Sequence, residues 1–229
     1  MSQTTLNLVA ITIFSLVMVS LLGPLLHISP VVPAIAVFGI LSFATLDTLS
    51  WQGQAGTLLV DWFNQFSPRH RARVIRHEAG HFLAAHLLDI PVTGYTLSAW
   101  DAFRQGQPGL GGVSFGAEEF NAALERGVLS TQILDRYCTV LMAGIAAETL
   151  LGDNAEGGVD DRQTFRLLWA QFKRPAMEGE QKERWALFQA KTLIKTHESA
   201  YAALVAAMEQ GASVERCREA IESHLKSHT

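Results

Sequence analysis

The order of apolar and polar residues divides the chain into an apolar N-terminal part and a mixed remainder. The stretch from Leu6 to Leu26 carries no charge over about 21 residues, roughly the length of helix that crosses the hydrocarbon core of a bilayer. A second apolar run extends from Val31 to Leu49, with Pro33 near its start and Asp47 near its end. We therefore predict that residues 1–50 form a membrane anchor of two transmembrane helices, at about 6–26 and 31–49.

The alternative for these runs is a pair of buried helices in a soluble protein. A secretory signal peptide fits less well, because the opening residues MSQTT carry no basic side chain. All 18 lysines and arginines lie at or after Arg69, and a basic cluster of Arg69, Arg71, Arg73 and Arg76 follows the second run. By the positive-inside rule, this cluster predicts an integral protein of a plasma or thylakoid-type membrane, with the following domain on the cytoplasmic or stromal side.

The segment 51–66 predicts a linker at the membrane interface. Its Trp51 and Trp62 are residues of the kind that lie among lipid headgroups. The clustered arginines then fall in the first turns of a predicted helix, where positive charge opposes the helix dipole. We expect membrane lipid with anionic headgroups to offset this repulsion, and a solvated helix face is the alternative.

Residues 67–229 predict a mostly helical domain with one small sheet, an α+β fold. Ser67 as the N-cap and Pro68 at the first helical position begin a helix that runs to about Leu88. VTGYTLSAW at 92–100 and GGVSFG at 111–116 flank a loop rich in glycine and proline, and they predict a β-hairpin. Further helices are predicted at 117–126, 130–151, 160–172, 182–210 and 213–225.

Composition and charge narrow the partners of this domain. The net charge is −4 and no basic tract occurs outside the arginine cluster, so nucleic acid is not an expected partner. The two cysteines, Cys138 and Cys217, lie far apart in the sequence and match no paired metal motif. This sparse use of cysteine fits a reducing compartment, and Cys138 lies in an apolar run as a core thiol.

The candidate chemistry is concentrated in VIRHEAGHFLAAH, residues 74–86. Positions four apart on a helix differ by about 40° around the axis, so His77 and His81 stack on one face and can share a metal ion. Glu78 lies beside them, near such an ion without having to bind it. This is the HExxH arrangement, in which imidazoles hold zinc and the glutamate acts on the bound water. His86 lies off this face, and we expect no ligand role for it.

A three-ligand zinc site needs one more donor, and GGVDDRQ at 157–163 contains two aspartates. If Asp160 is the N-cap of the following helix and Gln163 its capping partner, the Asp161 side chain is free to reach the metal. Its carboxylate would complete three protein ligands and leave a fourth position for water. The alternative is that both aspartates only cap the helix.

Three blocks of sequence resemble the peptidase domain of the FtsH family of membrane-anchored, ATP-dependent zinc metalloproteases, over about residues 67–225. HEAGH at 77–81 is similar to the zinc motif of that family. AGIAAETLLG at 143–152 is similar to its GxAAE helix, and GGVDD at 157–161 is similar to its GAxxD block. The resemblance implies a zinc-metallopeptidase fold, one Zn²⁺ ion, and Asp161 as the third ligand. Glu148 matches the glutamate of the family's helix, and both a paired buried carboxylate and a catalytic role stay open for it.

The chain also departs from the family pattern. FtsH proteins carry an ATPase module between their spans and their peptidase domain, whereas only residues 51–67 lie there and no GxxxxGK[ST] loop occurs in the sequence. We therefore expect that this chain does not unfold substrates by itself, and that a separate AAA ATPase or a full-length FtsH-type complex is a candidate partner. The stretch KRPAMEGEQKE at 173–183 resembles a shortened family segment, which leaves a hexamer or another homo-oligomer open.

The preferred interpretation is a membrane-anchored zinc metalloendopeptidase that hydrolyses peptide bonds of unfolded or membrane-associated proteins. His77, His81 and Asp161 would hold zinc, while Glu78 would accept a proton and pass it on. The residues expected to bind a peptide substrate by strand addition are Tyr95, Thr96, Leu97 and Ser98. The alternative function is a catalytically silent scaffold, as an accessory subunit or assembly factor of an FtsH-type complex. An intact Glu78 favours the enzyme, since a scaffold does not need it.

Overall fold

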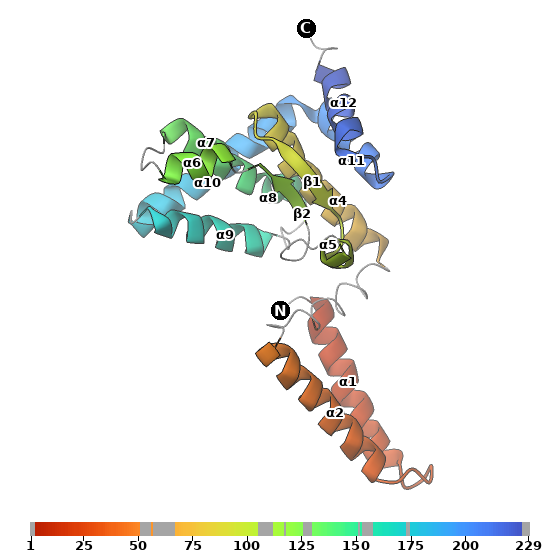
Figure 1. Cartoon of the computed structure of the whole chain (residues 1–229). Helices are drawn as coiled ribbons and strands as arrows, with labels where there is room; N and C mark the ends of the chain where they lie inside the picture. Colours follow the sequence, from red (N-terminus) through yellow and green to blue (C-terminus); the bar gives the residue numbers. More distant parts are fainter. Residues whose placement is uncertain are drawn as a thin grey trace. The chain divides into compact units, whose positions relative to one another are not determined.

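The structure of the chain is a computed structural model. It describes residues 3–50, 56, 67–104, 112–116, 118–125, 130–150, 152, 158–172 and 175–225. The chain forms two compact units, Met1–Ser67 and Pro68–Thr229 (Figure 1). The predicted interfacial segment, with Trp51 and Trp62, lies outside the described residues except for Gly56.

The first unit contains two apolar helices, α1 (Gln3–Leu22) and α2 (Val31–Ser50), which lie side by side. α2 is long and apolar enough to cross a membrane, whereas the apolar part of α1, Leu6–Leu22, is shorter. Most large apolar side chains of both helices are exposed within this unit, Phe14 and Phe38 among them. The described residues thus contain one helix with the length and composition of a membrane span.

The first predicted span is too long at its C-terminal end. α1 ends at Leu22 and not at Leu26. Gly23 and Pro24 follow at once, and a proline disfavours the helical conformation in the residue before it. The chain then turns, with His27 in the left-handed region at a φ of 56°, before α2 begins.

The second unit is built around α4 (Pro68–Leu87), which begins at the predicted proline. The elements that follow it are β1 (Val92–Thr96), α5 (Ala99–Arg104), β2 (Gly112–Phe115), α6 (Glu118–Glu125), α7 (Thr131–Leu141), α8 (Ala143–Leu150), α9 (Gly158–Gln171), α10 (Ala176–Thr196), α11 (Glu198–Glu209) and α12 (Val214–Leu225). A mostly helical unit with one small sheet was predicted, and this coarse fold class is confirmed.

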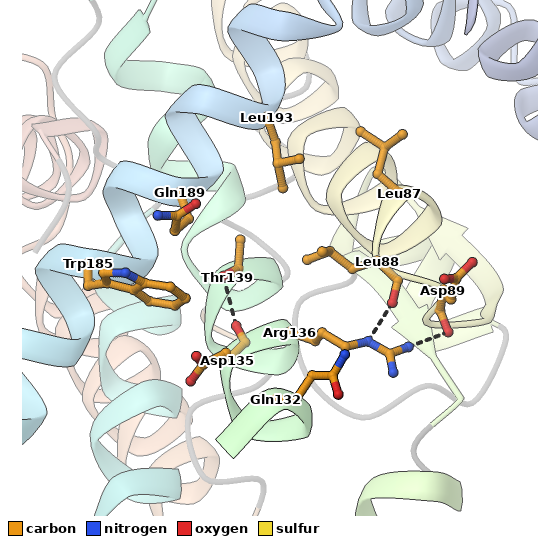
Figure 2. Close-up of a pocket in the computed structure, with 10 residues that line it drawn as sticks. All are labelled: Leu87, Leu88, Asp89, Gln132, Asp135, Arg136, Thr139, Trp185, Gln189 and Leu193. Atoms are coloured by element: carbon orange, nitrogen blue, oxygen red, sulfur yellow. Dashed lines mark hydrogen bonds between the residues drawn. The ribbon is translucent and has the colours of Figure 1, made fainter. Parts of the chain in front are cut away.

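α4 is the central helix of the second unit, with α8 packed directly against it (Figure 1). Gly80 allows this close approach, because a Cβ atom there would lie 2.5 Å from the carbonyl oxygen of Ala143 and 2.9 Å from the Cβ of Ala147. On α4, Phe82 and Leu83 are fully buried in the core that α8, α10 and α11 share. α7 and α10 also face the C-terminal end of α4 (Figure 2).

The small sheet consists of β1 and β2 in antiparallel register, with Tyr95 opposite Val113 and Thr96 opposite Gly112. The predicted first strand, 92–100, is wrong beyond Thr96, because the chain turns into α5. Ser98 explains the turn: its hydroxyl oxygen accepts a hydrogen bond from the backbone N–H of Asp101 at 3.0 Å, as an N-cap does.

Two long predicted helices are each divided in the structure. The predicted helix at 130–151 is interrupted at Met142, between α7 and α8. The predicted helix at 182–210 is interrupted at His197, between α10 and α11, and α10 begins earlier, at Ala176. Neither interruption contains the glycine or proline from which helix ends are usually predicted.

The turn at His197 returns the chain to the central helix. His197 has φ −116° and ψ 39°, outside the helical region. α11 therefore packs on α4, where the hydroxyl of Tyr201 donates to the carbonyl of Arg76 at 2.8 Å. This contact supports α4 one residue before the first histidine of the candidate site.

Candidate metal centre

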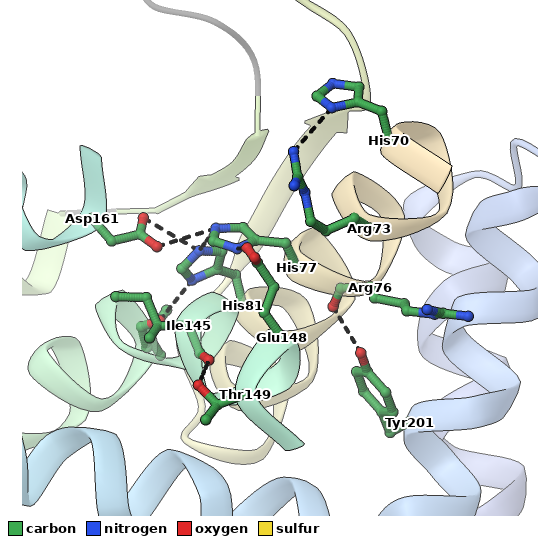
Figure 3. A network of polar contacts seen from close by, with 11 residues as sticks. His70, Arg73, Arg76, His77, His81, Ile145, Glu148, Thr149, Asp161 and Tyr201 are labelled. Atoms are coloured by element: carbon green, nitrogen blue, oxygen red, sulfur yellow. Dashed lines mark hydrogen bonds and ion pairs between the residues drawn. The ribbon is translucent and has the colours of Figure 1, made fainter. Parts of the chain in front are cut away.

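His77 and His81 lie one turn apart on the buried side of α4, as the spacing predicts (Figure 3). Their side chains converge, with 3.1 Å between the two Nε2 atoms. Both residues are withdrawn from water, with exposed fractions of 7% and 6%. The two imidazoles therefore offer a pair of adjacent nitrogen ligands.

The other ring nitrogen of each histidine is held by a partner from α7 or α8. His81 Nδ1 lies 2.7 Å from the carbonyl oxygen of Val140, and a carbonyl can only accept, so Nδ1 carries the proton. His77 Nδ1 lies 2.5 Å from Oε1 of Glu148, a carboxylate that is 1% exposed. In the neutral form of each ring the lone pair is then on Nε2, the atom that faces the site. Metal-binding histidines are commonly oriented in this way.

Asp161 brings the third donor from the first turn of α9. Its Oδ2 lies 3.1 Å from His77 Nε2, and its Oδ1 lies 3.4 Å from His81 Nε2. The three ligand atoms all lie within 4.8 Å of one another, a spacing that could hold one metal ion. Among the described residues, this is the only such group of His, Cys, Asp and Glu side chains.

The position of Asp161 does not come from the capping arrangement that the sequence predicted. α9 begins at Gly158, so Asp160 lies inside the first turn and is not the N-cap. Gly158 itself packs closely, because a Cβ atom there would lie 2.5 Å from Cγ1 of Ile145 on α8. The contact between α8 and the start of α9 thus carries the Asp161 carboxylate to the histidines.

Two features of the structure fit a cation among these side chains. Asp161 Oδ2 is buried and faces His77 Nε2 at 3.1 Å, so with a neutral imidazole two lone pairs would meet there unless a cation lies between them. Gly144 leaves the space that the ligands need, since a Cβ atom there would lie 2.4 Å from His77 Nε2 and 2.5 Å from His81 Nε2. The glycine of the GxAAE-like block is therefore required by the geometry of the ligands.

The electrostatics of the site favour positive charge. Burial lowers the pKa of His77, but contacts with Asp161 and Glu148 outweigh burial and raise this pKa to about 10. Burial also lowers the pKa of His81, but the Asp161 carboxylate outweighs burial and raises this pKa above its usual value. Burial would raise the pKa of Asp161, yet the two histidines hold it below its usual value. A divalent cation would replace the protons that the imidazoles hold without one.

Glu78 lies beside the ligands and contacts β2. Its Oε2 accepts a hydrogen bond from the backbone N–H of Val113 at 2.9 Å. Burial raises the pKa of this carboxyl group above its usual value, although the neighbouring histidines oppose the rise. Gly112, at a φ of 126°, brings the start of β2 close, because a Cβ atom there would lie 3.3 Å from Oε2.

The side chains of the four residues predicted to bind substrate contact other parts of the chain, and their role in substrate binding stays a prediction. Tyr95 donates its hydroxyl to the carbonyl of Ala212 at 2.5 Å. The remaining three are Thr96, whose hydroxyl oxygen accepts from the N–H of Gly112, Ser98, which caps α5, and Leu97, which packs against the core. The strand that contacts Glu78 is β2, which the sequence had placed in the hairpin without assigning it a role.

Comparison with protein-family models, with curated proteins and with solved structures finds no match to this chain. The resemblance to FtsH proteases therefore rests on the three sequence blocks alone. Glu148, for which two roles were open, contacts His77 and, among the described residues, no other member of the group His77, His81 and Asp161. His86 is half-buried, and its exclusion from the ligands stays a prediction.

Proposed function

We propose that the chain is a membrane-anchored zinc metalloendopeptidase. The observation that carries the proposal is the convergence of two oriented imidazoles and the Asp161 carboxylate, with Glu78 next to them. Two histidine nitrogens and one carboxylate oxygen form a donor set typical of catalytic zinc, which leaves a fourth position open. The soft thiolate donors of structural zinc sites are not part of this group.

The residues around the ligands suit peptide hydrolysis. Zinc in such a site activates a water molecule and polarises the substrate carbonyl. Glu78 would accept a proton from the attacking water and pass it to the departing amine. Burial raises the pKa of Glu78, which favours its uptake of a proton.

β2 supports a way of holding the substrate. The N–H of Val113 points to Glu78 and not into the ladder with β1, so this edge of β2 faces the proposed reaction site. A substrate in extended conformation would pair with that edge. The strand-addition hypothesis is thus retained, with β2 in place of Tyr95–Ser98.

The apolar N-terminal helices support attachment to a membrane. In the proposal, α1 and α2 form a transmembrane anchor in a plasma or thylakoid-type membrane, and the metal-binding unit lies on the cytoplasmic or stromal side. Substrates are unfolded or membrane-associated polypeptides, because the sequence contains no phosphate-binding loop to power unfolding. A separate AAA ATPase or an FtsH-type complex would supply unfolding where it is needed.

Zinc content and casein cleavage test the proposal when the wild type is measured beside Glu78→Gln. Both proteins are expected to hold about one zinc, and only the wild type is expected to cut casein, with a loss of at least about 100-fold in the variant. The absence of a phosphate-binding loop also favours a second function, a silent accessory subunit of an FtsH-type complex. Zinc in both proteins with cleavage in neither would replace the first proposal with the second.

A further inference from the structure

The surface around the first turns of α4 concentrates positive charge. Arg69, Arg71, Arg73 and Arg76 all lie there, and the first turn contains no acidic residue. Beyond Arg76 the chain carries 14 of its 18 basic residues but 20 of its 22 acidic residues. The basic cluster is therefore a local positive patch on a unit that is otherwise acidic.

The arginines of this cluster keep their charge. Within the part of the chain that the structure describes, Arg69, Arg71 and Arg76 form no ion pair. Arg73 donates from Nη2 to Nδ1 of His70 at 3.1 Å. A ring nitrogen that accepts a hydrogen bond carries no proton, so this contact does not neutralise the guanidinium.

Acidic side chains on the helices that pack against α4 do not pair with the cluster. Glu148 of α8 contacts the first histidine of the metal centre, and Asp135 of α7 pairs with a lysine of α10. Glu198 and Glu209 of α11 are exposed, and the ion pairs between described residues include neither of them. The positive end of the helix dipole adds to the repulsion among the arginines. An anion from outside the unit would relieve this repulsion.

The directions of the arginines favour an extended anionic surface over a single small anion. Arg69 and Arg71 are both exposed, and residues two apart on a helix point about 160° away from each other. Figure 3 shows Arg73 and Arg76 directed to different sides of α4 as well. A small anion cannot contact side chains that diverge in this way, whereas a surface that faces the start of the helix can.

The apolar helices of the first unit indicate which anionic surface this is. Only residues 51–67 separate α2 from α4, and a fully extended chain of this length spans at most about 60 Å. If α2 crosses a membrane, as proposed, the cluster stays within that distance of the lipid surface. A tether of this kind raises the effective concentration of the surface, so a weak attraction for each arginine is enough for binding.

We propose that the basic cluster binds the anionic phospholipid headgroups of the membrane and holds the first turn of α4 toward the bilayer. His77 lies eight residues after Arg69, about 12 Å along the helix, so the metal centre lies close to the lipid surface. Resting on the proposed function, the preferred substrates are membrane proteins that are cut in the segment next to their spans.

Photo-crosslinking of lipids to the full chain in lipid nanodiscs tests this proposal. The probes are phosphatidylglycerol and phosphatidylcholine that carry the same photoreactive group beside the headgroup. Phosphatidylglycerol is expected to label residues 67–76 at least about fivefold more than phosphatidylcholine, since a basic residue near an anionic surface contributes about that factor. NaCl at about 0.5 M should remove the difference, because it screens exposed charges. Arg69→Gln with Arg71→Gln should lower the labelling by phosphatidylglycerol by about 25-fold, about fivefold for each arginine.

Arg184→Gln with Lys195→Gln is the matched control, because it removes the same charge from two exposed positions of α10. It should leave the labelling of residues 67–76 unchanged. The proposal is overturned if both lipids label these residues equally, if salt has no effect, or if the control lowers the labelling as much as the α4 variant does. Preferential labelling in a protein that binds no zinc and never cleaves casein would retain the lipid contact and discard the peptidase. Casein cleavage without preferential labelling would do the reverse.

Discussion

Gly144→Ala is the substitution that tests the packing of α8 against the metal ligands. The added Cβ would lie 2.4 Å from His77 Nε2 and 2.5 Å from His81 Nε2, whereas real Cβ atoms stay beyond 3.0 Å. The rings cannot easily move away, because Glu148 holds His77 and the carbonyl of Val140 holds His81. The substitution therefore displaces the two nitrogens that would bind the metal.

The expected cost has two parts. Overpacking of a buried contact destabilises the metal-free protein by about 1 to 3 kcal/mol. Displacement of the oriented ligands should weaken zinc binding by about 10- to 100-fold. This is the loss typical when a residue that hydrogen-bonds to a metal ligand is removed. Competition with a chromophoric zinc chelator measures the affinity, and thermal unfolding without metal measures the stability.

Gly39→Ala is the matched control for this measurement. Gly39 is a helical glycine of α2 with nothing within 4 Å of the added Cβ position. Its substitution should leave zinc affinity unchanged. If Gly144→Ala also binds zinc as tightly as the wild type, the two imidazoles do not hold the metal through the nitrogens that face Gly144, and the ligand assignment is wrong.

Four further predictions concern the same site. Glu148→Ala should weaken zinc binding by about 10- to 100-fold and Glu148→Gln by less, because the amide oxygen still accepts from His77 Nδ1; equal losses would contradict this orienting role. Val113→Pro removes the backbone N–H that donates a hydrogen bond to Glu78 and leaves the ladder with β1 intact. The kcat should therefore fall roughly tenfold at unchanged zinc content. An unchanged kcat would show that catalysis does not use this hydrogen bond. Zinc at 100 times its Kd should add about 2.7 kcal/mol and raise Tm by roughly 5 to 10 °C, and EDTA should reverse the shift. Without metal, the pKa of His77 is raised to about 10 from 6.5, so the stability that the protonated imidazole contributes is complete below pH 6.5 and is lost as the pH rises toward 10. The Tm of the metal-free protein should therefore fall between pH 6.5 and 10. A Tm that stays constant over this range would contradict the attraction between His77 and the two carboxylates.

The main helix and its histidines were predictable because local signals agree there. Ser67 and Pro68 mark the start of α4, and the spacing of His77 and His81 places both rings on one face of any helix. The sequence also pointed to Asp161, through the GGVDD block and through a capping argument; only the capping argument is wrong, since α9 begins before Asp160. Asp161 therefore remains a candidate ligand although the local structure expected to carry it was wrong.

The contacts that shape the site could not be read from the sequence, because they join distant segments. The bonds from His81 to Val140 and from His77 to Glu148 depend on how α4, α7 and α8 pack. The interruption at Met142 has no glycine or proline to announce it, and it separates α7 from the helix that carries Glu148. The contact between β2 and Glu78 was missed for the same reason, since a hairpin pattern does not show which edge meets another helix.

X-ray absorption at the zinc edge, on the full chain loaded with one equivalent of zinc, tests the central claim most directly. The account predicts a four-coordinate zinc with two imidazole nitrogens and carboxylate oxygen at about 2 Å, and a changed spectrum with weaker binding in Asp161→Ala. A spectrum with sulfur ligands, or one that Asp161→Ala leaves unchanged, would contradict the metal centre on which the proposed peptidase depends.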